Sequence, residues 1–207
     1  MAELPRELND NPLLRADGLP PFDRIEPGHV VPAVRHVLAE AARQLDELEK
    51  DVKPTWHASV ERLDQIGRPF EYTWGPVSHL TGVMNSPELR TAHETVLGEM
   101  VSFGLRVKQS EPIYKALKAL REGPDWQSLD DAQRRIVEQK LLAAELAGIG
   151  LEPKERERFN EIARELSQLA TDFSNHVLDA TKAFSLVLTR QEDTEGLPPS
   201  LKQLAAQ

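Results

Sequence analysis

The sequence predicts an all-α protein with at most one short strand, near residues 183–189. Three observations support this prediction. Apolar residues recur at intervals of three and four along most of the chain, the spacing that places side chains on one helical face. Prolines and capping residues stand at the starts of most of these segments. Residues 183–189 instead combine aromatic and β-branched residues without a helical period, which is typical of a strand.

The first 26 residues are predicted to form an extended N-terminal arm, and residues 27–207 a helical domain. Prolines are too frequent in the arm for regular structure to begin there. We expect its apolar residues to anchor it to the domain. These residues are Leu13, Leu14, Leu19, Phe22 and Ile25.

Two helical segments should follow the arm. The first runs over residues 30–52, with Pro32 in its first turn, where the missing N–H costs little, and with Pro54 as its stop. The second begins near Trp56, and we expect a kink near Pro69 or Pro76 because proline removes a helical hydrogen bond.

Start signals are clearest in the middle of the chain. Ser86 is a predicted N-cap, followed by Pro87 at the first helical position, for a helix that reaches about residue 108. The same signal at Ser110-Glu111-Pro112 opens a shorter helix, which Gly123-Pro124 ends. We expect Ser128 to cap a helix that ends near residue 147, where Gly148 supplies a left-handed residue.

The most periodic segment begins at Pro153 and is predicted to pass Asp179. Its apolar residues share one side of the helix and are Phe159, Ile162, Leu166, Leu169, Phe173, Val177 and Leu178. Residues 197–200 should cap a final helical turn or two. Aromatic residues at helical spacing are assigned to the core, and they are Trp56, Phe70, Trp74, Phe103, Phe159 and Phe173.

Composition excludes several functions. The chain has 25 Lys and Arg against 34 Asp and Glu, a net charge of −9, which disfavours nucleic acid and anionic membranes as partners. It has no cysteine, which excludes disulfides, thiolate metal sites and cysteine nucleophiles. The N-terminus lacks the features of a signal peptide, and no apolar run is long enough to span a membrane. We therefore expect a cytoplasmic protein.

A metal site would have to use the six histidines. A zinc peptidase needs His-Glu-x-x-His on a helix, because two imidazoles four residues apart bind the metal together. The segment that starts at His93-Glu94 places Leu97 at the fifth position, and leucine is not a ligand. We expect Leu97 in a helix core and no metal at His93.

Other pairings of chemical groups are equally weak. His36 with Glu40, and His57 with Glu61, have the spacing of ordinary pairs on a solvated helix face. Ser78-His79 lacks the context of a nucleophile elbow, so His79 is expected to be structural rather than a substrate contact. No catalytic, cofactor-binding or metal-binding residue is therefore assigned.

Several segments, in the same order along the chain, resemble the thimet oligopeptidase family of zinc metallopeptidases. The resemblance extends from Asn11 to Ser200, and its most specific part is Pro76-Val77-Ser78-His79-Leu80 followed by Asn85-Ser86-Pro87-Glu88-Leu89-Arg90. The other segments are residues 11–14, 19–22, 29–34, 148–151, 166–181 and 195–200.

The resemblance implies the N-terminal helical region of a two-lobed zinc metalloendopeptidase that degrades short unstructured peptides. This region would form part of the wall of the substrate channel, and the C-terminal catalytic part, which holds the zinc motif, is missing. Alone, the chain should be inactive and hold no cofactor, and its uncovered faces would allow self-association. The alternatives are a standalone, non-catalytic helical protein that binds peptides or acts as a scaffold, and an unrelated helical scaffold.

Overall fold

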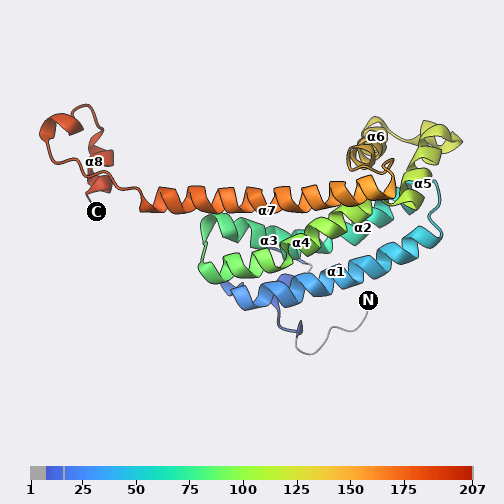
Figure 1. Ribbon diagram of the computed structural model, residues 1–207, viewed down its shortest axis with the longest axis horizontal. Coiled ribbons are helices and arrows are strands. Elements are labelled where there is room, and N and C mark those ends of the chain that lie inside the picture. The colour runs from blue at the N-terminus through green and yellow to red at the C-terminus, as the bar shows by residue number, and fades with distance from the viewer. Residues whose placement is uncertain (1–7, 16, 207) are drawn as a thin grey trace. The chain divides into compact units, whose positions relative to one another are not determined.

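The computed structural model describes residues 8–15 and 17–206, and it consists of two compact units, Met1–Leu169 and Ala170–Gln207. Within the described residues every regular element is a helix, so the all-α prediction is confirmed (Figure 1). The α-helices are α1 (Pro27–Lys50), α2 (Arg62–Gly67), α3 (Pro69–Val83), α4 (Pro87–Lys108), α5 (Glu111–Glu122), α6 (Asp131–Leu146), α7 (Pro153–Ala183) and α8 (Pro199–Ala205). Short 3₁₀ turns cover Pro12–Leu14, Phe22–Arg24, Pro124–Ser128 and Gln191–Thr194, and Trp56–Glu61 is π-helical.

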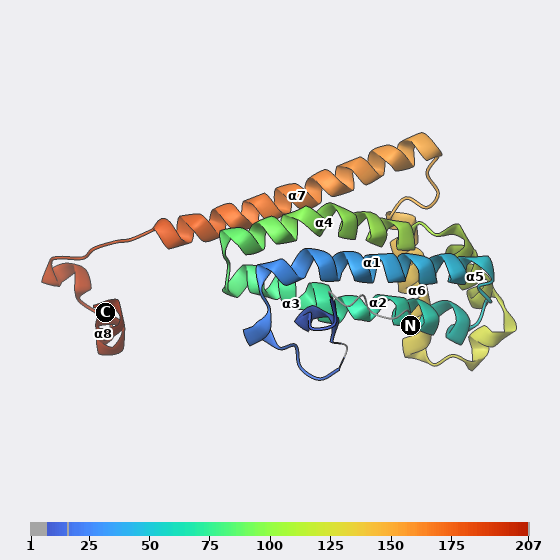
Figure 2. The ribbon, with the colours of Figure 1, turned by 90° about the horizontal axis from the view of Figure 1, so that it is seen from below.

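Helix α1 joins two hydrophobic cores in the first unit. It packs against both α3 and α4, and the three helices lie side by side (Figure 2). Its first half contributes Val30, Ala33 and Val34 to a core shared with α3 and α4. Its second half contributes Leu45 and Leu48 to a core shared with α5 and α6. The periodicity that predicted α1 therefore serves two different sets of partners.

The arm before α1 is anchored mainly by Leu13. The Leu13 side chain is fully buried, and the backbone carbonyl oxygen of Leu13 accepts a hydrogen bond of 2.8 Å from the hydroxyl of Thr73 in α3. Asn11 caps the turn at Leu13 and donates from Nδ2 to the carbonyl oxygen of His29 at 2.9 Å. Leu19 is 92% exposed, so the expectation that it anchors the arm is wrong.

Helix boundaries follow the proline signals with two corrections. Helix α1 begins at Pro27, one turn before the predicted start, because the Glu26 N–H donates to Nδ1 of His29 at 3.0 Å and caps it there. Pro32 therefore lies inside the helix and not in its first turn. Near Pro69, one of the two predicted kink positions, the helix is interrupted: α2 ends at Gly67 and α3 begins at Pro69, whereas Pro76 lies inside α3.

Side-chain caps start two later helices. Ser86 accepts a hydrogen bond of 3.1 Å from the Leu89 N–H, as predicted for α4. The cap of α6 is Asp130 rather than Ser128. Asp130 and Gln133 form a capping box, with reciprocal bonds of 2.8 and 3.0 Å.

Helix α7 covers the predicted segment, but it has no buried residue. In the first unit it exposes Ile162, Leu166 and Leu169. In the second unit Phe173 is 70% exposed, so its assignment to the core is wrong. Residues 184–189, where at most one strand was expected, have no regular structure.

Candidate functional site

Histidines do not converge on a common site. His93 is buried in α4, where its ring stacks on Trp74 with centroids 4.5 Å apart, and burial lowers the pKa of His93. Leu97, one turn further along, is buried as expected. Among residues 8–15 and 17–206, no three His, Asp or Glu side chains lie together in a way that suits a metal ion.

The remaining predicted pairs have local roles. Nδ1 of His57 lies 2.7 Å from the Glu61 carboxylate on the same exposed helix face, as the spacing predicted. The Glu40 carboxylate accepts a hydrogen bond of 3.1 Å from Arg43. The exposed ring of His79 lies against the ring of Phe22 in the arm in an edge-to-face arrangement, with centroids 5.5 Å apart. None of these groups forms a catalytic arrangement.

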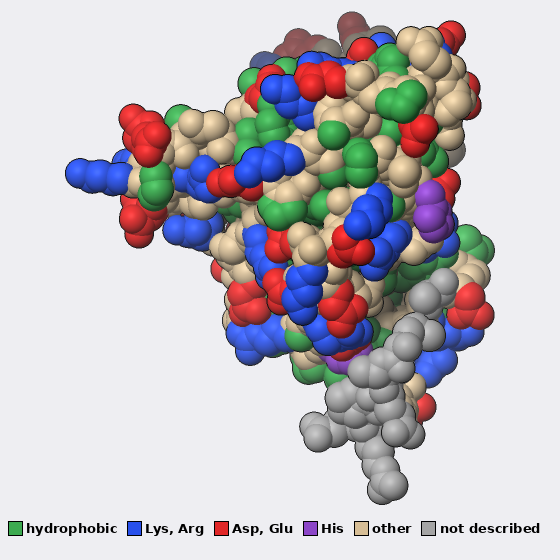
Figure 3. Space-filling view, turned by 90° about the vertical axis from the view of Figure 1, so that its right-hand side faces the viewer, with side chains coloured by type: hydrophobic (Ala, Val, Ile, Leu, Met, Phe, Trp, Pro, Cys, Tyr) green, Lys and Arg blue, Asp and Glu red, His purple; other side chains and the backbone are tan. Residues whose placement is uncertain are grey.

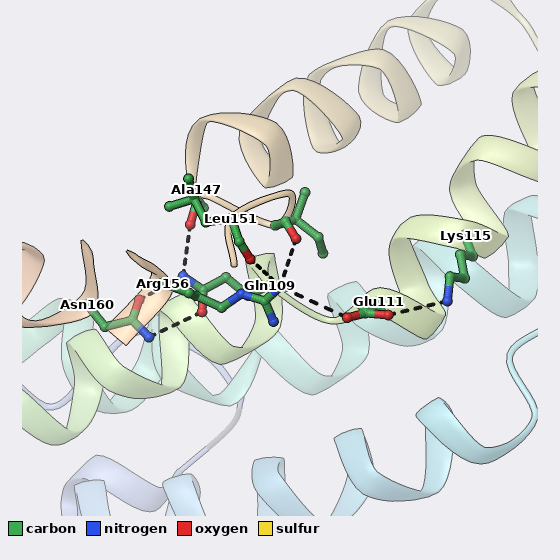
Figure 4. Close-up of polar contacts among 8 residues, drawn as sticks. Gln109, Glu111, Lys115, Ala147, Leu151, Arg156 and Asn160 are labelled. Atoms are coloured by element: carbon green, nitrogen blue, oxygen red, sulfur yellow. Dashed lines mark hydrogen bonds and ion pairs between the residues drawn. The ribbon is translucent and has the colours of Figure 1, made fainter. Parts of the chain in front are cut away.

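A polar junction, defined here as Gln109, Glu111, Arg156 and Asn160, connects α4 and α5 to the start of α7 (Figure 4). Nε2 of Gln109 donates to Oδ1 of Asn160 at 2.7 Å and to the carbonyl oxygen of Ala147 at 2.8 Å. Nδ2 of Asn160 donates back to Oε1 of Gln109 at 3.3 Å. These bonds hold the loop after α6 and the second turn of α7 against the end of α4.

Arg156 completes the junction from α7. Its Nη2 donates to the carbonyl oxygens of Ile149 and Leu151, each at 3.0 Å, and lies 4.0 Å from the Glu111 carboxylate. Gly148 permits this loop because its φ of +81° is in the left-handed region, as predicted. The guanidinium thus satisfies two carbonyl groups of the turn that connects α6 to α7.

A hollow of about 390 Å³ lies beside the polar junction. The Ser110 hydroxyl and Nε of Arg156 are buried there without a protein partner. Arg106 forms ion pairs with Asp46 and with Glu49, the latter at 3.5 Å. Because both signs of charge line the hollow, its electrostatics favour neither an anion nor a cation.

A second hollow, of about 630 Å³, lies between α4 and the first-unit part of α7. Its lining combines charged and amide groups with the Cβ-free surface of Gly98, and consists of Glu94, Thr95, Leu97, Gly98, Glu99, Ser102, Arg164 and Gln168. Some of these groups are already engaged. Glu99 pairs with Arg35 of α1 at 2.8 Å, and the Thr95 hydroxyl donates to the carbonyl oxygen of Thr91 at 2.7 Å. This groove offers hydrogen-bonding groups, and no metal-binding cluster occurs there among the described residues.

Charged side chains of both signs are interspersed on the face shown in Figure 3, with hydrophobic groups between them. No helix among the described residues has the length and apolar character needed to cross a membrane. The feature that sequence reasoning missed is the polar junction. Gln109 and Asn160 lie 51 residues apart and carry no local motif, so no signal in one sequence predicts their contact.

Comparisons with known proteins now identify the family. The family described as "Neurolysin/Thimet oligopeptidase, N-terminal domain" matches residues 34–156. Organellar oligopeptidase A, chloroplastic/mitochondrial, of Arabidopsis thaliana is 48% identical over 200 residues, which are 97% of this chain and 25% of that protein. Probable cytosolic oligopeptidase A of the same plant is 47% identical, over 97% of this chain and 28% of the relative.

Bacterial relatives, like the plant proteins, are named oligopeptidase A. Oligopeptidase A of Escherichia coli is 39% identical over 191 residues, which are 92% of this chain and 28% of that protein. The chain thus spans only about a quarter of the length of the relatives it matches. From the family match and these identities, the chain belongs to the neurolysin/thimet oligopeptidase family and contains its N-terminal domain.

Proposed function

We propose that this chain is the N-terminal part of a zinc-dependent oligopeptidase that hydrolyses short unstructured peptides. One observation carries the proposal: the chain aligns over 97% of its length with proteins named oligopeptidase A, yet covers only 25–28% of them. The activity that those names describe would then reside in the complete enzyme.

The role proposed for this chain is to form part of the wall of the peptide channel. Two properties support this role. In the first unit, α1 belongs to both hydrophobic cores and so connects them into one support. The polar junction and the Gly148 turn then place the first-unit part of α7 against α4, which creates the polar groove between them. Groups in such a wall orient a substrate and exclude folded proteins by shape.

The described residues do not fit a zinc ion. His93, the first residue of the incomplete His-Glu-x-x-Leu segment, is stacked on Trp74, and no metal-binding cluster occurs among the described residues. We therefore assign the zinc of the complete enzyme to residues outside this chain, where it would act as a Lewis acid toward the peptide bond. On this proposal the chain alone has no peptidase activity.

A chimaera tests the proposal. Residues 8–206 would replace the matched segment of the Arabidopsis organellar oligopeptidase A, and cleavage of a short unstructured peptide would be compared for the chimaera, the chain alone and the parent enzyme. We expect zinc-dependent cleavage by the chimaera and none by the chain. A folded chimaera that binds zinc but does not cleave would contradict the proposed role. Binding of peptides by the chain alone, without cleavage in the chimaera, would favour the standalone peptide-binding alternative.

The cytoplasm is the proposed location. One relative is named cytosolic and another chloroplastic/mitochondrial, so relatives with this domain work in more than one compartment. Fractionation of the source cells, with an antibody against the chain, tests the location directly. Recovery in an organelle or a membrane fraction would contradict it.

A further inference from the structure

The segment that follows α7 leaves unusual amounts of apolar surface uncovered. Phe184 is 73% exposed, Leu186 69%, Val187 77% and Leu188 42%. Four apolar side chains among five consecutive residues therefore face solvent. Because each buried apolar side chain contributes favourably to folding, such a cluster indicates a surface that another part of a protein covers.

The same segment has an unpaired backbone. The Phe184 N–H closes the last turn of α7 by donating to the carbonyl oxygen of Ala180 at 3.0 Å. From residue 185 to residue 189, no backbone hydrogen bond to another described segment exists, and no regular structure is formed. The N–H and C=O groups of these residues are therefore available for a strand partner.

The order of side chains suits a strand with one buried face. In an extended chain, successive side chains point to opposite faces. Phe184, Leu186 and Leu188 then share a wholly apolar face. The opposite face carries Ser185, Val187 and Thr189, of which two have hydroxyl groups and two are β-branched. This alternation is typical of a strand that covers a core on one side.

We propose that residues 184–189 form an edge strand on a β-sheet supplied by the remainder of the oligopeptidase, with Phe184, Leu186 and Leu188 packed on its core. The inference rests on the proposed function, because that function supplies the remainder. The relatives are about four times as long as the matched segment, so enough chain exists outside this structure to provide a sheet.

A second copy of this chain fits the segment less well. The described residues contain no other strand, so pairing between two copies would give an isolated two-stranded ribbon, which is marginally stable in water. Each copy also carries a net charge of −9, which opposes association. A sheet that already has two or more strands avoids the first of these costs.

Hydrogen exchange of residues 185–189 tests the inference in two proteins. In the chain alone we expect fast exchange at every concentration. In the chimaera with the Arabidopsis enzyme we expect alternate amides to be protected about tenfold or more, because only every second N–H of an edge strand faces its partner. A smaller chimaera with only residues 170–206 serves as a second test if the larger one does not fold.

Two matched substitutions then test the direction of the apolar face. Leu186→Asp should reduce the protection of the segment in the chimaera by about tenfold, since the charge enters the buried face. Val187 is the next residue and lies on the opposite face of the strand. Val187→Asp should change the protection of the segment by less than about twofold. Equal effects of the two substitutions would overturn the assignment of the faces.

The outcomes separate this inference from the proposed function. An active chimaera with unprotected residues 185–189 would overturn the strand and leave the function standing. A zinc-loaded but inactive chimaera with protected, alternating amides would support the strand and contradict the function. Protection that rises with the concentration of the chain alone would show pairing with a second copy and overturn the inference.

Discussion

The side-chain amides of Gln109 and Asn160 hydrogen-bond to each other in both directions, at 2.7 and 3.3 Å. Gln109 is the C-cap of α4, and Asn160 lies in the second turn of α7. Because Gln109 also donates to the carbonyl oxygen of Ala147, one side chain joins α4, the loop after α6, and α7. The first-unit part of α7 has no fully buried residue, and this polar contact helps to hold it against α4.

Replacing Gln109 with methionine should destabilise the chain by about 1–3 kcal/mol, because the Ala147 carbonyl and the Asn160 amide lose their partner. Urea unfolding measures the change. The control Gln139→Met, on the exposed face of α6, should stay within about 0.5 kcal/mol. Adding Asn160→Leu should cost less than the sum of the single changes, and full additivity would argue against the pairing.

Gly148→Ala should cost about 1–2 kcal/mol, because alanine is strained at a φ of +81°. Its Cβ would also lie 2.6 Å from Cδ1 of Leu151, so that side chain must move. Gly150→Ala, two residues on, meets nothing within 4 Å and should change the free energy of unfolding by less than about 0.5 kcal/mol. Equal losses for the two variants in thermal or urea unfolding would refute the role of the left-handed turn.

Thr73→Val should loosen the arm. The Thr73 hydroxyl donates to the buried Leu13 carbonyl oxygen at 2.8 Å, and valine has the same shape without the donor. We expect a loss of about 1–3 kcal/mol. Proteolysis near residues 8–15 should become faster. Thr95→Val is the matched control, because the exposed Thr95 hydroxyl donates to the Thr91 carbonyl oxygen within its own helix. An arm that resists the protease equally in both variants would contradict this role of Thr73.

Stability should fall as pH decreases below about 6.5, in part because of His93. Burial lowers the pKa of His93 from its ordinary value of 6.5, so the unfolded chain binds this proton more readily than the folded one. The contribution is fully present above the unfolded pKa and is lost as pH falls toward the folded value. His93→Phe preserves an aromatic ring against Trp74 and should flatten this part of the profile. The free energy of unfolding in urea would be measured between pH 7.5 and 5.5 for both chains. If its slope against pH is the same in the His93→Phe variant as in the original chain, His93 is excluded as the source of the slope.

Local signals predicted most of the helices. Ser86 and Gly148 each have a role that depends on neighbouring residues, and both were placed correctly. The start of α1 was misplaced because Glu26 and His29 form a cap that the usual cap residues do not suggest. For the N-cap of α6, Ser128 was predicted instead of Asp130, two residues later, although Gln133 is the reciprocal partner of Asp130 in a capping box.

Burial and long-range contacts were harder to predict. Periodicity identifies the apolar side of α7 but does not say whether anything covers it, and Phe173 proved to be exposed. Leu19 likewise has an apolar side chain and no partner in the described residues that buries it. The contact of Gln109 with Asn160 depends on the folded path of the chain over 51 residues, which one sequence does not encode in any local pattern.

The two cores of the first unit have a consequence for synthesis. Every buried residue of both cores lies between Leu13 and Leu141, so all of them are synthesised before α7. The first unit is therefore expected to fold while translation continues, since domains fold as units during synthesis. The exposed apolar residues after α7 then emerge attached to a finished scaffold. If the chain is the N-terminal part of a longer enzyme, as proposed, this domain would be a folded template on which the later segments assemble.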